Sequence, residues 1–174
     1  GMSYNPLFIY GGTGLGKTHL IQAIGNNIKN KYGDKKVHYI TSEKFSMDYI
    51  NSIQNNKIQL FKEKYRKYDV LIMDDIQFLS RKEKTQEELF HLFNALYDNN
   101  KQIIFSSDKH PSYIPELEDR LRSRFAAGMI VDVALPDYES RLEIIKSKAS
   151  QSGFFPESDI LEYVSSVVQG NIRE

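Results

Sequence analysis

Residues 11–18 are the part of this sequence whose composition and spacing point most directly to chemistry. They are Gly11, Gly12, Thr13, Gly14, Leu15, Gly16, Lys17 and Thr18. Glycines let the backbone turn closely around a ligand, and the free N–H groups at the start of a helix bind anions. The segment therefore predicts a loop that holds the phosphates of a nucleotide, with Lys17 reaching the β- and γ-phosphates and Thr18 ligating Mg²⁺. The alternative is a glycine-rich turn that binds nothing.

His19 follows the loop directly. We group it with the nucleotide-binding residues because of this position alone. Packing beside the loop is the plainer interpretation of this side chain.

Two adjacent carboxylates follow an apolar run at residues 70–73. Strands of a parallel sheet direct their carboxyl ends toward the ligand crevice, so Asp74 and Asp75 are expected to lie near the phosphate loop. Oxygen ligands suit Mg²⁺, which assigns Asp74 to the metal. Asp75 is then a candidate to polarise the attacking water. The alternative is a solvated strand end with two unrelated acids.

Two further polar segments are candidates for sensing or stabilising a phosphoryl group. Ser107 and Asp108 end the apolar run at 103–106, where either could position water or report the γ-phosphate. Residues 119–125 hold three arginines, a residue type that neutralises charge on a transferring phosphoryl group. Arg173 is a further isolated candidate. A turn before Pro111 and a solvated helix are the respective alternatives.

The elements that must position these residues alternate along the chain. Short apolar runs predict strands at residues 7–10, 37–41, 70–73, 103–106 and 129–133, each covered on both faces. Longer patterns predict helices at 17–31, 44–52, 58–65, 86–97 and 138–151, with Thr85 as the N-cap of the fourth. The alternation predicts an α/β fold with a parallel sheet between helices. Pro136 begins a purely helical segment, so we expect a nucleotide-binding core at 1–135 and a partial helical lid at 136–174.

Composition excludes several classes of function. The 174 residues contain no cysteine, which removes disulfides, thiolate zinc sites and cysteine nucleophiles. Lys and Arg total 23, as do Asp and Glu, so a wholesale electrostatic grip on nucleic acid is not expected, although a local basic patch is compatible with this balance. No run approaches the roughly 20 apolar residues that cross a bilayer, and no signal peptide is evident.

The four elements, taken in order, resemble an AAA+ ATPase. A closer similarity is to the bacterial chromosomal replication initiators, a family within that class. The strings that carry it are residues 5–11, 14–20, 22–26, 39–45, 74–78 and 119–125. The resemblance implies a five-stranded AAA+ P-loop NTPase core with the start of a small helical lid, an extra helical element before Asp74, and binding of ATP or ADP with Mg²⁺.

The resemblance also implies roles for individual residues. Arg124 would be the arginine finger acting on ATP held by a neighbouring subunit, with Arg120 assisting the assembly contact. Asp108 resembles the first sensor and Arg173 the second. Contacts with single-stranded DNA would fall on Ile50, Lys82, Lys84 and Thr85. For these residues, helix packing of Ile50 and a merely solvated loop at 81–84 remain the alternatives.

The partners implied by the resemblance are further copies of the chain in a head-to-tail helical oligomer, single-stranded DNA and the replicative helicase machinery. Origin duplex DNA would be bound only through a C-terminal domain that is absent here, and acidic membrane lipids by the full-length family. The resemblance further implies that the protein is cytoplasmic and nucleoid-associated. It also implies slow, regulatory ATP hydrolysis that depends on Mg²⁺. The alternatives are an initiator-like regulator or helicase loader of the same class, a small-molecule P-loop kinase, and a nucleotide-gated interaction module that barely hydrolyses ATP.

Overall fold

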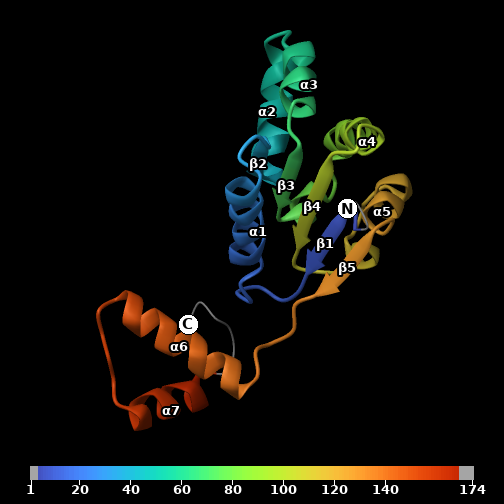
Figure 1. Ribbon diagram of the computed structural model, residues 1–174. Helices are drawn as coiled ribbons and strands as arrows, with labels where there is room; N and C mark the ends of the chain where they lie inside the picture. The colour runs from blue at the N-terminus through green and yellow to red at the C-terminus, as the bar shows by residue number, and fades with distance from the viewer. Residues whose placement is uncertain (1–3, 169–174) are drawn as a thin grey trace. The chain divides into compact units, whose positions relative to one another are not determined.

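Five short strands form the centre of the fold in the computed structural model, which describes residues 4–168. The strands are β1 (Leu7–Tyr10), β2 (Val37–Thr41), β3 (Val70–Asp74), β4 (Gln102–Ser107) and β5 (Met129–Asp132). They pair in parallel in the order β2-β3-β4-β1-β5. The predicted five-stranded parallel sheet is therefore confirmed, and β1 leads into the glycine loop from an interior position (Figure 1).

The register of the sheet aligns the carboxyl ends of four strands. Tyr10 at the end of β1 pairs with Ser107 of β4, and Thr41 at the end of β2 pairs with Asp74 of β3. The polar residues that follow these strands consequently share one edge of the sheet, as parallel strands require.

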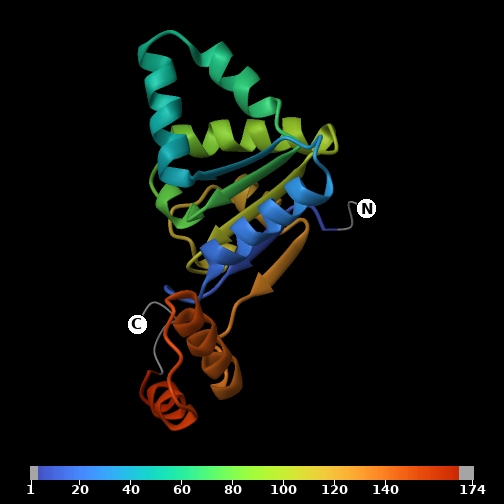
Figure 2. The same cartoon turned by 60° about the vertical axis from the view of Figure 1, so that its left-hand side comes forward.

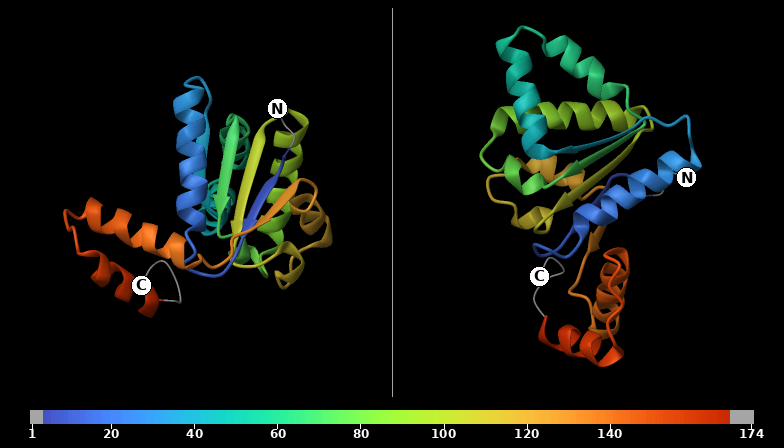
Figure 3. Two further views of the ribbon diagram at one scale, coloured as in Figure 1. Left: turned by 60° about the horizontal axis from the view of Figure 1, so that its bottom comes forward. Right: turned by 90° about the vertical axis from the view of Figure 1, so that its left-hand side faces the viewer.

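Helices cover both faces of the sheet. Helix α1 (Lys17–Lys31) lies on one face, whereas α4 (Glu83–Asp98) and α5 (Asp119–Phe125) lie on the other (Figures 2 and 3). Gly25 allows α1 to approach closely, because a Cβ atom there would lie 2.7 Å from Cδ1 of Ile72. Helices α2 (Ser42–Gln54) and α3 (Ile58–Arg66) form the extra element between β2 and β3, and they pack against each other and near α4.

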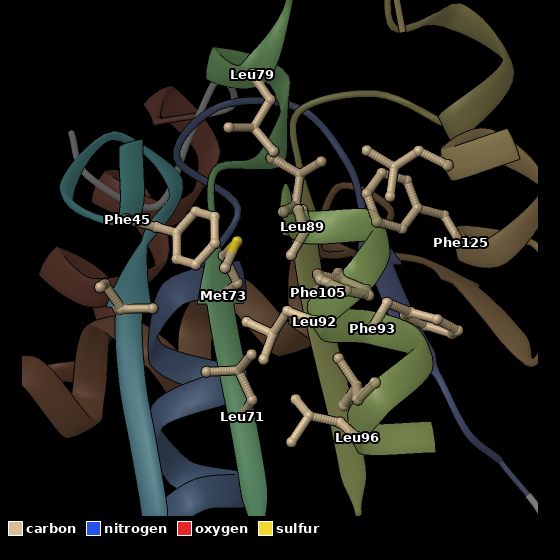
Figure 4. Close-up of a cluster of buried hydrophobic side chains, with 14 of the residues drawn as sticks. Phe45, Leu71, Met73, Leu79, Leu89, Leu92, Phe93, Leu96, Phe105 and Phe125 are labelled. Atoms are coloured by element: carbon tan, nitrogen blue, oxygen red, sulfur yellow. The ribbon is translucent and has the colours of Figure 1, made fainter. Parts of the chain in front are cut away.

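The main core lies between the sheet and α4. Figure 4 shows Leu89, Leu92, Phe93 and Leu96 of α4 directed toward strand residues that include Phe105. Complete burial of such side chains stabilises the fold by about 1.5–3 kcal/mol each. Strands β3 and β4 are buried as predicted, but β2 and β5 at the sheet edges are only partly covered.

The helices predicted at 17–31 and 138–151 have these bounds in the structure. Those predicted at 44–52 and 86–97 extend further at both ends, and the one predicted at 58–65 ends one residue later. Helix α2 begins at Ser42 because the Thr41 hydroxyl caps it, accepting from Lys44 N at 3.2 Å. The assignment of Thr85 as an N-cap is wrong, since α4 begins at Glu83. The Thr85 hydroxyl instead lies 3.2 Å from that of Ser46, in a buried contact between α4 and α2.

The chain divides into two compact units, residues 1–11 with 17–132 and residues 12–16 with 133–174. In the second, α6 (Tyr138–Gln151) is capped by Asp137, whose carboxylate accepts from Ser140 N at 2.8 Å. A turn at residues 152–153 and an irregular segment at 154–157, rather than the expected turn at 154–156, lead to α7 (Ser158–Val167). Arg141 of α6 donates to Ser165 O of α7 at 3.3 Å. Within residues 4–168, no helix is both long and apolar enough for a membrane span.

The remaining short elements are η1 (Ile76–Leu79), directly after β3, and η2 (Pro111–Tyr113), after β4. Arg173 lies outside the described residues.

Candidate nucleotide-binding site

The glycine loop leads from β1 directly into the first turn of α1. Gly11 N donates to Ser107 O at 3.3 Å, which ties the start of the loop to β4. Gly14 and Gly16 have φ angles of 79° and 86°, which residues with a Cβ rarely adopt. Lys17, the first residue of α1, is buried. A left-handed glycine loop that ends at a helix N-terminus is the arrangement that binds phosphate.

Asp74 is the most completely buried acid at the carboxyl edge of the sheet, with 1 % of its surface exposed. Its Oδ2 atom accepts from the hydroxyls of Thr18 and Tyr39, both at 2.7 Å. Its Oδ1 atom accepts from Ser106 Oγ and, at 3.1 Å, from the backbone N–H of Asp75. Four donors therefore hold this one carboxylate in a fixed orientation. Thr18 and Asp74, the two residues expected to ligate Mg²⁺, are thus in direct contact.

Tyr39 and Ser106 belong to this site although their sequence positions carried no signal that identifies them. Burial, and then the hydrogen bond to Asp74, raise the pKa of the Tyr39 phenol above its usual 10. Tyr39 therefore remains a neutral donor at physiological pH. Both residues were placed by strand pairing, since β2 and β4 flank β3 in the sheet.

Asp75 adopts a left-handed backbone conformation, with φ 58° and ψ 50°. Such a conformation is costly for a residue other than glycine, and it is retained only when neighbouring contacts hold it. The Ser42 hydroxyl donates to its carbonyl at 2.5 Å, and Gln77 Nε2 donates to its Oδ1 atom at 3.1 Å. The turn directs Asp75 differently from Asp74, so the two carboxylates do not share one set of donors.

Asp108 lies after β4 and is connected to the same group of residues. Its backbone N–H donates to Gln77 Oε1 at 3.2 Å. Its carboxylate Oδ1 is buried and lies 3.7 Å from the ammonium of Lys109, with no hydrogen bond among the residues described. The structure therefore brings Thr18, Asp74 and Asp75 to one edge of the sheet together with Asp108.

Arg124 is held against α4 of its own chain. Its Nε donates to Asn94 Oδ1 at 2.9 Å, and its guanidinium lies 5.5 Å from the centroid of the Phe90 ring. Arg120 lies 4.8 Å from the same ring and donates to Glu118 at 2.6 Å. In the described part of the chain, the side-chain contacts of Arg124 are with α4 rather than with Thr18 or Asp74. The sequence did not indicate a role for Phe90 and Asn94, because their contacts with Arg124 join α4 to α5 and leave no local pattern.

The residues predicted to contact DNA fall on α2 and on the start of α4. Ile50 on α2 is 47 % exposed, and Lys84 is also exposed. Lys82 is partly buried, and Thr85 is buried with its hydroxyl against Ser46. The structure thus leaves Ile50 and Lys84 accessible to a ligand, whereas Thr85 would first have to leave its partner.

The site offers two hard oxygen ligands, the Thr18 hydroxyl and the Asp74 carboxylate, and the buried cation Lys17. Within residues 4–168, no cluster of three or more His, Cys, Asp or Glu residues could enclose a metal ion. His19 is exposed on α1.

A parallel sheet of this order, with a glycine loop after β1 and an acidic pair after β3, defines an AAA+ P-loop nucleotide-binding domain. The family model described as the bacterial DnaA ATPase domain matches residues 1–132. The chain belongs to this family.

Curated relatives and solved structures agree with this assignment. The chain is 54 % identical over 172 residues to the chromosomal replication initiator protein DnaA of Caldanaerobacter subterraneus subsp. tengcongensis, which covers 99 % of this chain and 39 % of the relative. Domain III of the Thermotoga maritima replication initiation protein DnaA superposes with a TM-score of 0.95 at 46 % identity, covering 98 % of this chain and 71 % of that one. The chain thus spans about two fifths of the length of its curated relative.

A second solved structure contains ligands. A replication initiator DnaA bound to AMPPCP and single-stranded DNA has a TM-score of 0.90 and 40 % identity, covering 99 % of this chain and 53 % of that chain.

Proposed function

We propose that this chain is the ATP-binding and ATP-hydrolysing core of a bacterial replication initiator. The observation that carries the proposal is the direct contact of the Thr18 hydroxyl with the buried Asp74 carboxylate, at the end of the glycine loop. The relatives' description as chromosomal replication initiators supports the biological role. The initiator bound to AMPPCP supports a triphosphate as the ligand.

The phosphates would be bound by the backbone N–H groups of residues 11–18 and by Lys17. These N–H groups lie at the positive end of the α1 dipole, which favours the anion. Lys17 adds a full charge at the first position of that helix. The hydrogen bond from Gly11 N to Ser107 O fixes the start of this segment to β4.

Thr18 and Asp74 would hold Mg²⁺ together with phosphate oxygens. The fit rests on their donor set, since a hydroxyl oxygen and a carboxylate oxygen lie 2.7 Å apart. When bound, the ion would neutralise charge on the phosphates. Tyr39 and Ser106 would keep the Asp74 carboxylate oriented throughout.

Asp75 would orient and polarise the attacking water, and Asp108 would act as the first sensor. Asp75 is partly exposed, unlike Asp74, and its strained turn gives its carboxylate a direction of its own. Arg173 is assigned the second sensor role by the family resemblance alone.

Arg124 would act on ATP held by the next copy of the chain, with Arg120 assisting the contact. The packing of Arg124 on Phe90 and Asn94 supports this role, because it fixes the guanidinium on the surface of its own chain before assembly. A head-to-tail contact of this kind is heterologous, and it produces an open helical filament when the rotation does not close.

Such a filament would align weak DNA contacts from successive copies along one strand. Exposed Ile50 would pack on a sugar or base, while Lys82 and Lys84 would follow the phosphates. Avidity would offset the low affinity of each copy, which has no net charge. Duplex origin DNA and the replicative helicase would be engaged by the larger protein, acting at the chromosome in the cytoplasm.

The experiment that tests the proposal compares two variants in ATP binding and turnover. Lys17→Ala should lose ATP binding by calorimetry, because the phosphates lose their buried counter-charge. Asp75→Asn should bind ATP as the unmodified protein does but lose turnover. Unchanged ATP affinity in Lys17→Ala would refute the location of the site, and normal hydrolysis by Asp75→Asn would remove Asp75 from the chemistry.

A further inference from the structure

Gln77 connects the residue assigned to water activation with the residue assigned to sensing, and it lies in the 74–78 string without a role assigned from the sequence. It lies in η1, two residues after Asp75. Its Nε2 atom donates to Asp75 Oδ1 at 3.1 Å, and its Oε1 atom accepts from the backbone N–H of Asp108 at 3.2 Å. One side-chain amide therefore spans the ends of β3 and β4.

The chemistry of the two partners fixes the orientation of this amide. A carboxylate only accepts hydrogen bonds, so it must face the NH₂ group of Gln77. A backbone N–H only donates, so it must face the carbonyl oxygen. Rotating the amide by 180° would break both contacts, and the bridge therefore has a single arrangement.

The bridge also helps to hold Asp75 in its left-handed backbone conformation. At φ 58° this residue is held by the contact of its carbonyl with Ser42 and by the contact of its carboxylate with Gln77. The Ser42 contact fixes the main chain, whereas Gln77 makes the only hydrogen bond to the carboxylate within residues 4–168. Loss of Gln77 would leave the turn in place but free the carboxylate to rotate.

We propose that Gln77 is a positioning residue for ATP hydrolysis, which aims the Asp75 carboxylate and couples its direction to the position of Asp108. The inference rests on the proposed function, because it takes Asp75 as the group that orients water. Gln77 does not touch the phosphates in this scheme. Movement of the β4 end, when Asp108 meets the nucleotide, is passed to Asp75 through the amide.

The coupling predicts that replacing Gln77 lowers the rate of ATP turnover without lowering the affinity for ATP. Small displacements of a catalytic group lower rates strongly, by roughly 100-fold for about 1 Å. Gln77→Met keeps the length of the side chain but removes both hydrogen bonds. In the full-length protein it should lower ATP turnover by roughly 10- to 100-fold and leave the ATP dissociation constant within about twofold.

Gln77→Glu separates the two halves of the bridge. It retains an acceptor for the Asp108 N–H but places a second carboxylate beside that of Asp75. Like charges repel, so the Asp75 carboxylate should turn away from residue 77, and turnover should fall as in Gln77→Met while ATP affinity is retained. A purely structural role for Gln77 would lower the stability of the fold and leave the turnover of the folded protein unchanged.

The experiment measures single-turnover hydrolysis and ATP affinity for both variants, with Asp75→Asn in parallel and Gln59→Met, an exposed position on α3, as the matched control. Slow turnover with retained affinity is expected in both Gln77 variants. If Asp75→Asn is inactive while both Gln77 variants hydrolyse ATP normally, the role of Gln77 is refuted and the proposed function stands. If Asp75→Asn hydrolyses ATP normally, the proposed chemistry itself fails. Should Gln77→Met not fold, the single-turnover rate of Gln77→Glu decides the question.

Discussion

Replacing Asp74 by asparagine should separate the folding role of this carboxylate from its role in binding. Asparagine has the same shape, and its oxygen can still accept from Ser106 and from the N–H of Asp75. Its NH₂ group can donate to the hydroxyls of Thr18 and Tyr39, which accept as well as donate. The unliganded variant should therefore fold, with a free energy of unfolding lower by about 1–2 kcal/mol as charge-assisted hydrogen bonds become neutral.

The loss of unfolding free energy in Asp74→Asn can be compared with the loss in Asp74→Ala. Asp74→Ala removes the partner of three hydroxyls, whereas the N–H of Asp75 keeps Ser106 Oγ at 3.1 Å. Ser106 is fully buried, so its hydroxyl cannot turn to water, while Thr18 and Tyr39 are partly exposed. Loss of these bonds should lower the free energy of unfolding by roughly 3–5 kcal/mol, which is more than twice the effect of asparagine.

The assay is denaturant unfolding with and without ATP and Mg²⁺. A ligand at 100 times its dissociation constant stabilises the native state by about 2.7 kcal/mol. The unmodified protein should show this increase, and Asp74→Asn should lose most of it because the metal loses its charged ligand. Full stabilisation of Asp74→Asn by ATP and Mg²⁺ would refute the assignment of Asp74 to the metal.

Three other predictions concern assembly, DNA and pH. Arg124→Ala should bind ATP normally but assemble at least tenfold more weakly, since a hydrogen bond to a charged group contributes about 1.5–3 kcal/mol. Sedimentation measures the assembly, and oligomers of normal size would exclude the contact. Joint replacement of Lys82 and Lys84 by alanine should reduce the salt dependence of single-stranded DNA binding by about 0.7 per cation, and an unchanged slope would place the DNA elsewhere. Burial, and then the nearby Lys64, lower the pKa of His38 below 6.5. Because the unfolded chain then binds the proton more readily, stability should fall as the pH drops below 6.5, and His38→Phe should flatten this decline in denaturant midpoints.

Local sequence patterns predicted the sheet well because its strands are short apolar runs bounded by polar residues. Helix α1 was predicted with its observed bounds, since the loop and Lys17 mark its start. The start of α4 was wrong because Thr85 has the composition of a cap, yet its hydroxyl is used in a contact with Ser46, 39 positions away in sequence. That contact exists only once α2 has packed beside α4.

Contacts between residues distant in sequence also limited the prediction of the site. The residue types and spacing of the glycine loop and the acidic pair carry their chemistry within a few positions, so they could be predicted. Tyr39 and Gln77 reach their partners through strand pairing and through a left-handed turn at Asp75. Neither feature has a local signature, because the strain of the turn is stabilised by residues from other elements.

The central claim is that ATP lies between two copies, bound by the loop of one and completed by Arg124 of the other. Mixing Lys17→Ala with Arg124→Ala tests it most directly, because each variant lacks a different half of the shared site. Each variant alone should show no ATP turnover, and the mixture should regain it, since Arg124 of the first variant can act on ATP held by the second. A mixture that remains as inactive as its components would contradict the account, as would full activity of Arg124→Ala by itself.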